Sequence, residues 1–163
     1  MRIEMRTSMN TPIPWQYDEF QQVGRDYASQ AEVDVYDTRH GQFRDLEAEG
    51  NRALDALGVS GGQVIIDFGC GTGTFAIQAA RRGAGVHAVD VSQAMIEYAK
   101  SKAAAAGVSG VTFHHAGFLT YAHPDGTADA IQTTFAFHHL PDFWKGIALK
   151  RMRAMVRPGG RLY

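Results

Sequence analysis

Residues 64–74 read V-I-I-D-F-G-C-G-T-G-T, and this segment gives the strongest indication of the fold class. An apolar run leads into Asp67, and glycines follow at alternating positions, Gly69, Gly71 and Gly73. The short apolar run is typical of a strand buried on both faces, and the glycines predict a tight turn into a helix. Because glycine has no Cβ, a ligand can lie against the main-chain N–H groups of such a turn. We therefore expect a ligand site outside the carboxyl end of this strand, as in open α/β sheets.

Beyond this turn the chain alternates strand-like and helix-like segments. The expected strands are 64–68, 85–91, 111–115 and 129–135, with a fifth that only begins at 161 after a Pro-Gly-Gly turn. Parallel strands joined by right-handed crossovers predict the spatial order 3-2-1-4 with helices on both faces. The fold class is thus α/β, a Rossmann-like doubly wound parallel sheet formed by residues 51–163.

The first third of the chain has a different character. Residues 10–50 are rich in Gln, Asp, Glu and Tyr, and we expect two short helices that form a lid over the site, followed by a helix over 43–57. Residues 1–9 are expected to be disordered. The apolar surface of the lid comes from aromatic side chains, namely Trp15, Tyr17, Phe20, Tyr27 and Tyr36.

Composition excludes several classes of protein. The chain has 163 residues, enough for one domain, and a formal net charge of −1, which gives no sign of a nucleic-acid-binding surface. Its single cysteine fits a reducing compartment, no apolar stretch is long enough to span a bilayer, and the N-terminus does not read as a secretory signal. We therefore expect a cytoplasmic location, with neither nucleic acid nor membrane as a partner.

Four blocks, in this order and spacing, resemble the class I S-adenosylmethionine-dependent methyltransferases. They are I-I-D-F-G-C-G-T-G (65–73), V-H-A-V-D-V-S (86–92), V-T-F-H-H-A-G-F (111–118) and D-A-I-Q-T-T-F-A-F-H-H-L (129–140). The end M-V-R-P-G-G-R-L (155–162) is similar to the family's lead into its fifth strand. The small-molecule members of the quinone-biosynthesis type are the most similar. The resemblance implies S-adenosylmethionine as cofactor, S-adenosylhomocysteine as product, and a small-molecule acceptor.

The resemblance also implies which residues hold the cofactor. The glycine loop, with Cys70 and Thr72 between its glycines, faces the amino-acid end, and Asp67 helps to hold the ammonium. Asp90, followed by Val91, binds the ribose hydroxyls. The alternative for Asp90 is an N-cap of the helix that starts near Ser92. Met95 packs on the adenine in the family, although a methionine at this position is equally consistent with core packing.

One position departs from the family pattern. Where relatives commonly have an aspartate whose carboxylate binds the adenine amino group, this chain has Gly117, which cannot do so. The backbone N–H of Phe118 is then expected to bind the ring, with the Phe118 side chain as a wall of the pocket. Plain core packing is the alternative for Phe118.

The methyl-transfer end is expected where the fourth strand ends, at Thr134 and Phe135. The nearby His138 and His139 are candidate general bases, because the unperturbed pKa of histidine lies near neutrality. Local packing is the alternative role for either imidazole. From the N-terminal part, Tyr36 is the candidate that closes over the cofactor carboxylate, with surface packing as its alternative.

Two other functions are alternatives to methyl transfer. A dinucleotide site for an NAD-dependent oxidoreductase requires Gly or Ala where this chain has Thr74, as well as a substrate domain that we do not find. The second alternative is a cofactor-binding module without activity. It is suggested by the end of the chain, which comes as the fifth strand begins and which we interpret as C-terminal truncation. The sheet edge left open in this way favours a homodimer.

No metal site is expected, since no Cys/His spacing resembles one and the neighbours His114 and His115 point to opposite faces of a strand.

Overall fold

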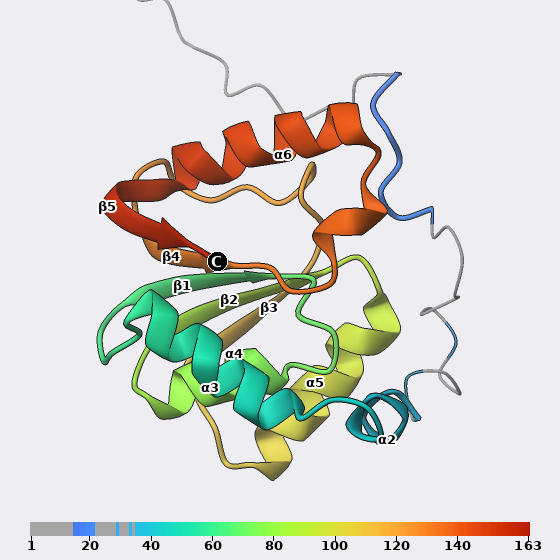
Figure 1. The fold of residues 1–163 in the computed structure, drawn as a ribbon, viewed down its shortest axis with the longest axis vertical. Helices are drawn as coiled ribbons and strands as arrows, with labels where there is room; N and C mark the ends of the chain where they lie inside the picture. The colour runs from blue at the N-terminus through green and yellow to red at the C-terminus, as the bar shows by residue number, and fades with distance from the viewer. Residues whose placement is uncertain (1–14, 22–28, 30–32, 34) are drawn as a thin grey trace, which may run out of the picture.

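A five-stranded parallel sheet forms the centre of the molecule, in the order β3-β2-β1-β4-β5 (Figure 1). The computed structural model describes residues 15–21, 29, 33 and 35–163. All four strand pairings are parallel, which confirms the predicted topology. The strands are β1 (Val64–Phe68), β2 (Gly85–Asp90), β3 (Val111–His115), β4 (Ala128–Gln132) and β5 (Val156–Leu162).

Helices cover both faces of the sheet, as a doubly wound fold requires. In Figure 1, α3, α4 and α5 lie on one side, and α6 lies on the other. The helices are α2 (Tyr36–Gly41), α3 (Leu46–Leu57), α4 (Thr74–Arg81), α5 (Gln93–Ala105) and α6 (Asp142–Met155), with the short 3-10 helix η1 (Phe137–His139) before α6.

The central strand β1 joins the two halves of the core. Ile65 is fully buried against the side that carries α3 and α4, whereas Ile66 and Phe68 are fully buried on the side that carries α6. Successive side chains of a strand point to opposite faces, so an uninterrupted apolar run is what a strand between two helical layers needs. The apolar run that decides the fold therefore serves both layers.

Helix ends follow local capping signals. The helix predicted over 43–57 begins at Leu46, because the Asp45 side chain accepts a hydrogen bond from the Ala48 N–H at 2.9 Å and so caps it. It ends at Gly58, as predicted. At the start of α5, the Ser92 hydroxyl accepts the Met95 N–H at 3.2 Å, which confirms Ser92 as the N-cap.

The fourth strand is shorter than predicted, and the difference shapes the site. It ends at Gln132 rather than at residue 135. Phe135 has φ 59°, in the left-handed region, and η1 follows immediately. A bulky residue in this conformation cannot continue a strand, so the chain turns away over the end of the sheet. The three residues after Gln132 thus form a loop at the carboxyl end of β4.

The fifth strand begins earlier than predicted. The Pro-Gly-Gly segment does not precede the strand but lies inside it as a bulge: Ala128 pairs with Val156, and Ala130 pairs with Arg161. In the described sheet β5 has β4 as its neighbour on one side. The homodimer that would cover its other side stays a prediction.

Residues 15–21 lie beside η1 and the start of α6, whereas α2 lies near α5 (Figure 1). Residues 15–21 form turns rather than a helix, and the Trp15 ring contacts Trp144 at 5.8 Å between centroids. Of the two predicted short helices, α2 is described. Residues 1–9 and Tyr27 lie outside the described residues, and the lid stays a prediction.

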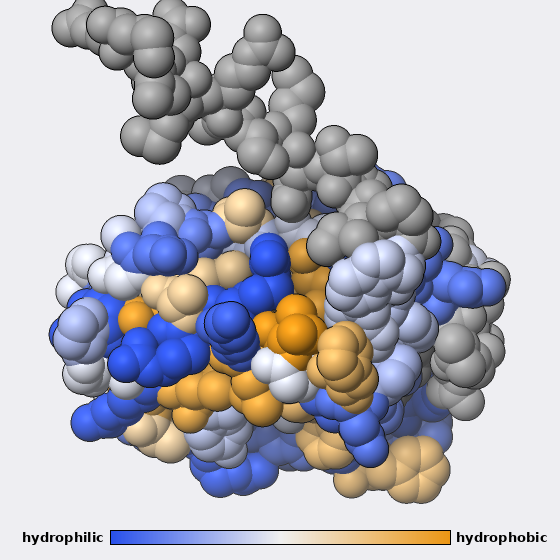
Figure 2. All heavy atoms as spheres, turned by 90° about the horizontal axis from the view of Figure 1, so that it is seen from above, coloured by the Kyte–Doolittle hydropathy of each residue, from blue (hydrophilic) through white to orange (hydrophobic). Residues whose placement is uncertain are grey.

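The outward side of α6 carries partly exposed apolar side chains, Phe143, Ile147 and Leu149. Figure 2 shows apolar residues gathered in the middle of the face on which α6 lies, with hydrophilic residues around them. Within the described ranges, no helix combines the length and the apolar character needed to cross a membrane.

Candidate functional site

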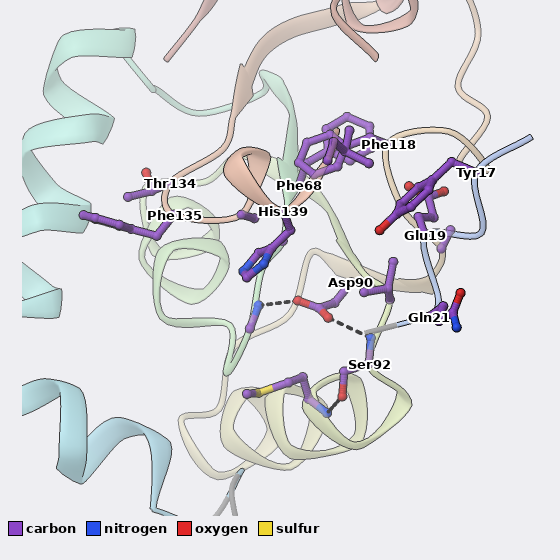
Figure 3. Close-up of a pocket in the computed structure, with 18 of the residues that line it drawn as sticks. Tyr17, Glu19, Gln21, Phe68, Asp90, Ser92, Phe118, Thr134, Phe135 and His139 are labelled. Atoms are coloured by element: carbon purple, nitrogen blue, oxygen red, sulfur yellow. Dashed lines mark hydrogen bonds between the residues drawn. The ribbon is translucent and has the colours of Figure 1, made fainter. Parts of the chain in front are cut away.

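A cavity opens at the carboxyl ends of β1, β2 and β4, where the sequence predicted the ligand site (Figure 3). Its walls come from the glycine loop, the β2–α5 junction, the loop after β3, the loop after β4 and the N-terminal segment. A second hollow continues from it past the glycine loop to Tyr36 and Arg44. Most of the predicted site residues line one or both: Tyr36, Asp67, Gly69, Cys70, Gly71, Thr72, Asp90, Val91, Met95, Gly117, Phe118, Thr134 and His139.

The glycines of this loop let other atoms come close to its backbone, but three of the loop's N–H groups are already hydrogen-bonded. Its three glycines all have positive φ, and a Cβ on Gly69 would lie 2.1 Å from the Cβ of Ala136. However, the N–H groups of Gly69 and Cys70 donate to Val89 O, and that of Gly71 donates to Asp90. The sheet and Asp90 thus already use these three N–H groups, and contact between the glycine loop and a ligand stays a prediction. Gly73 lies at the start of α4 and is not among the residues that line the cavity.

Two buried acceptors lie side by side at the ends of β1 and β4. Asp67 and Gln132 are paired in the sheet register and are 2% and 6% exposed. Asp67 Oδ2 and Gln132 Oε1 have no hydrogen-bond partner among the described residues. Burial, and then the nearby charge of Asp90, raise the pKa of Asp67 to about 8. Sequence reasoning missed Gln132, although a polar residue at the inner end of the apolar strand A-D-A-I-Q was an available signal.

Asp90 joins the glycine loop to the start of α5 through two hydrogen bonds. Its Oδ2 accepts the Gly71 N–H at 2.9 Å, and its Oδ1 accepts the Ser92 N–H at 2.8 Å. The capping alternative for Asp90 is wrong, because the Ser92 hydroxyl caps α5. Burial raises the pKa of Asp90, while the hydrogen bonds from the backbone of Ser92 and Gly71 oppose that shift. A carboxylate has about four acceptor positions, so Asp90 retains capacity toward the cavity.

Apolar side chains wall the end of the cavity beyond Asp90. Met95 and Phe118 are 3% and 7% exposed, and Phe118 stacks on Phe68 with 5.1 Å between ring centroids. The Phe118 side chain thus belongs to the core and also forms a wall of the cavity, so both of the roles expected for it apply. The missing side chain of Gly117 leaves space here, and Glu19 of the N-terminal segment fills it. Sequence reasoning missed Glu19, because about a hundred residues of chain separate it from this loop.

The loop after β4 brings one of the two candidate histidines to the cavity. His139 lines the cavity beside Thr134 and Phe135, and Figure 3 shows its ring between Asp90 and that loop. His138 is not among the lining residues, and its ring packs against His139 at 4.0 Å between centroids. Burial, and then the proximity of His138, lower the pKa of His139, which favours its neutral form near pH 7.

Helix α2 is fastened to the glycine loop by a polar cluster. The Thr72 hydroxyl donates to Asp37 at 2.6 Å, and Lys102 Nζ lies 2.6 Å from the same carboxylate. This contact places Tyr36 at the edge of the cavity and shows that the Thr72 side chain faces α2. Burial raises the pKa of the Cys70 thiol, so Cys70 is a packed turn residue rather than a nucleophile.

Histidines elsewhere form no metal site among the described residues, in which no group of three suitable ligands occurs. His115 and His114 point to opposite faces of β3, as predicted. His115 Nε2 lies 2.9 Å from Val91 O, whereas His114 joins a cluster with His87 and His123.

A parallel sheet of this order, with a glycine loop after β1 and acidic side chains at the ends of β1 and β2, is typical of α/β proteins that bind nucleotide-like ligands. Residues 65–160 match the family model described as a methyltransferase domain. The chain therefore belongs to the methyltransferase domain family.

Known proteins with similar sequences or structures are also described as methyltransferases. An uncharacterized methyltransferase of Geobacillus kaustophilus is 33% identical over 130 residues, which are 80% of this chain and 57% of that protein. The 27-O-demethylrifamycin SV methyltransferase of Amycolatopsis mediterranei is 31% identical over 76% of this chain and 48% of its own length. A crystal structure described as a putative S-adenosyl-L-methionine-dependent methyltransferase of Methanococcus maripaludis has the same fold, with a TM-score of 0.71 and 19% identity over 87% of this chain and 65% of that one. The chain thus spans about half the length of these two sequence relatives.

Proposed function

We propose that this chain binds S-adenosylmethionine and transfers its methyl group to a small-molecule acceptor. The observation that carries the proposal is the pair of buried acceptors, Asp67 Oδ2 and Gln132 Oε1, which have no partner among the described residues. Buried polar atoms are normally hydrogen-bonded. An ammonium group would supply the N–H donors that these two acceptors lack, together with a positive charge beside the carboxyl group of Asp67. The chain's family, and a relative named for its action on a rifamycin, support the same reading.

The remaining parts of the cofactor have matching walls in the same cavity. The acceptor capacity left on Asp90 suits two ribose hydroxyls. Beyond it, Val91, Met95 and Phe118 form apolar walls for a flat ring. The glycine loop, with Gly69 pressed against Ala136, allows the backbone to come close.

When bound, the sulfonium supplies an electrophilic methyl group, so the protein needs no strong acid or metal to activate it. The work left to the chain is to align the acceptor and exclude water. Thr134, Phe135 and Tyr36 surround the opening on the methyl side. We assign His139, rather than His138, as the group that takes a proton from the acceptor on a ring nitrogen, because His139 lines the cavity and its lowered pKa keeps it neutral.

Acceptor-dependent turnover tests the proposal. The chain is incubated with S-adenosylmethionine and separate panels of small phenols, amines and thiols, and S-adenosylhomocysteine is quantified by mass spectrometry. We expect one class of acceptor to raise product formation, and the variants Asp67→Asn and His139→Gln to lower it. Asp142→Asn is the matched control, because the Asp142 side chain is 97% exposed on α6. Formation of S-adenosylhomocysteine no faster than in Asp67→Asn, for every class of acceptor, would instead favour a cofactor-binding module without activity.

A further inference from the structure

The carboxylate of Glu19 lies in the wall of the cavity at the end away from the glycine loop. Figure 3 shows Glu19 beside Tyr17 and Gln21 on one side of Asp90, with Thr134 and Phe135 on the other. Glu19 is 8% exposed although it belongs to an N-terminal segment whose neighbours Asp18 and Phe20 are exposed. A buried glutamate on an otherwise exposed segment requires specific partners.

The hydrogen bonds that Glu19 accepts from described residues come from the loop after β3, and Arg151 of α6 adds a nearby positive charge. The Leu119 N–H donates to both carboxylate oxygens at 3.0 Å, and the Thr120 hydroxyl donates to Oε1 at 2.7 Å. The Leu119 N–H is thus shared by the two oxygens, and the backbone N–H of Thr120 also donates to the carboxylate, which leaves one of its about four acceptor positions for a further donor. Burial raises the pKa of Glu19, while the hydrogen bonds from Thr120 and Leu119 and the charge of Arg151 oppose that shift.

Oε2 occupies the space that a side chain at position 117 would need. A Cβ built on Gly117 would lie 2.4 Å from both Cδ and Oε2 of Glu19. Gly117 also lines the cavity, between Phe118 and Val91. The glycine and the glutamate are thus complementary: the loop omits a side chain, and the N-terminal segment inserts a carboxylate at the same place.

The segment that carries Glu19 is held by a second contact. The ring of Trp15 packs against Trp144 near the start of α6. From the same helix, Arg151 donates to the carbonyl oxygens of Phe118 and Tyr121 and fixes the loop from behind. Glu19 therefore meets a loop whose position is already set, which is what recognition of a ligand edge requires.

We propose that Glu19 Oε2 reads the base of the cofactor by accepting a hydrogen bond from the exocyclic amino group of adenine. This inference rests on the proposed function. The inference follows from the sequence of groups along the cavity. The acceptors Asp67 and Gln132 bind the ammonium, and Asp90 binds the ribose. The apolar slot beyond Asp90 ends at Glu19. A purine with an exocyclic amine presents an N–H donor at its edge, and Glu19 is the carboxylate that faces that end of the slot.

Paired calorimetric titrations test this assignment. The two ligands are S-adenosylhomocysteine and its analogue with hydrogen in place of the 6-amino group, and the readout is the ratio of their dissociation constants. Because a hydrogen bond to a charged acceptor is strong, we expect the native chain to bind the amino ligand at least about tenfold more tightly. In Glu19→Gln the amide oxygen can still accept from Leu119 and Thr120 while its NH₂ group replaces Oε2, so the ratio should fall to near one.

The ratio separates recognition from structural support. A glutamate that only braces the loop would weaken both ligands equally and leave the ratio unchanged in Glu19→Gln, which would overturn the proposal. Glu47→Gln, on the exposed side of α3, is the matched control and should keep the native ratio. Loss of the preference in Gln21→Ala but not in Glu19→Gln would assign the reading to Gln21 and also overturn it.

The native chain alone provides a measurement that does not depend on how the variant folds. Tight binding of both ligands with a ratio near one would reject the role of Glu19 and leave the proposed function intact. Failure of the native chain to bind S-adenosylhomocysteine at all would reject the proposed function itself.

Discussion

Asp67 is the residue whose electrostatics bear most directly on the account. Burial, and then the charge of Asp90, hold its pKa at about 8, so the carboxyl group is mostly protonated at pH 7. An ammonium group bound beside it favours the ionised form and lowers this pKa. Cofactor binding at pH 7 should therefore release a proton, and affinity should rise as the pH increases toward 8.

Calorimetry in buffers of different ionisation enthalpy measures that proton. We expect S-adenosylhomocysteine to release a substantial fraction of one proton at pH 7 from the native chain. In Asp67→Asn the release should disappear and the affinity should fall, whereas Asp142→Asn should behave as the native chain does. Equal proton release by Asp67→Asn and the native chain would show that Asp67 is not the group that responds to the ligand.

Asp90 is expected to contribute to affinity as well as to structure. Its two oxygens already hold Gly71 and Ser92, so a substitution affects both the loop and the ligand. In Asp90→Asn, the loss of charge-assisted bonds worth roughly 1.5–3 kcal/mol each should weaken S-adenosylhomocysteine binding by about tenfold or more. Thermal melts establish that the variant is folded. A folded variant with native affinity would mean that Asp90 serves only to join Gly71 to Ser92.

At the scale of elements, three histidines pack together where β2, β3 and the loop after β3 meet. His87 Nδ1 lies 3.0 Å from His114 Nε2, and the His87 and His123 rings are 4.8 Å apart between centroids. Tyr121 OH lies 3.3 Å from His123 Nδ1, and His123 Nε2 has no partner among the described residues. Burial lowers the pKa of all three histidines, and the proximity of the other imidazoles adds to this for His114 and His123.

The cluster predicts a loss of stability on mild acidification. Histidines in the unfolded chain titrate near pH 6.5, and those in the folded cluster titrate below that value. Below about pH 6.5 the unfolded chain takes up protons that the folded chain does not, so the free energy of unfolding falls. Urea titrations between pH 7.5 and 5 should show this fall, and it should be shallower in His123→Gln. His115→Gln, on the opposite face of β3, is the control, and identical pH dependence in His123→Gln and the native chain would contradict the prediction.

The sequence predicted the elements well wherever a local signal determined them. The apolar run of β1, the Ser92 cap and Gly58 at the end of α3 each appear where expected, because burial and capping act over a few residues. The end of β4 was not predictable in this way, since Phe135 adopts a left-handed backbone that its residue type disfavours. The bulge in β5 was also missed, because pairing with β4 absorbs a Pro-Gly-Gly segment that looks like a turn when it is considered alone.

For the whole molecule, the candidate site is assembled from distant parts of the chain. The residues at the ends of β1 and β2 could be predicted, because the topology of a parallel sheet brings strand ends together. Glu19 could not be assigned, because no periodicity or motif links an N-terminal glutamate to a loop a hundred residues later. Gln132 had a local signal, as a polar residue at the end of an apolar strand, but its pairing with Asp67 is visible only in the structure. Their roles follow from tertiary packing, which places Glu19 in the space beside Gly117 and leaves Asp67 Oδ2 without a hydrogen-bond partner among the described residues.

One calorimetric experiment distinguishes a cavity that takes S-adenosylmethionine from one that takes a dinucleotide. The chain is titrated separately with S-adenosylhomocysteine and with NAD under the same conditions. The account predicts saturable binding of S-adenosylhomocysteine with one site per chain, and no heat of binding with NAD. Saturable binding of NAD together with no response to S-adenosylhomocysteine would contradict the account.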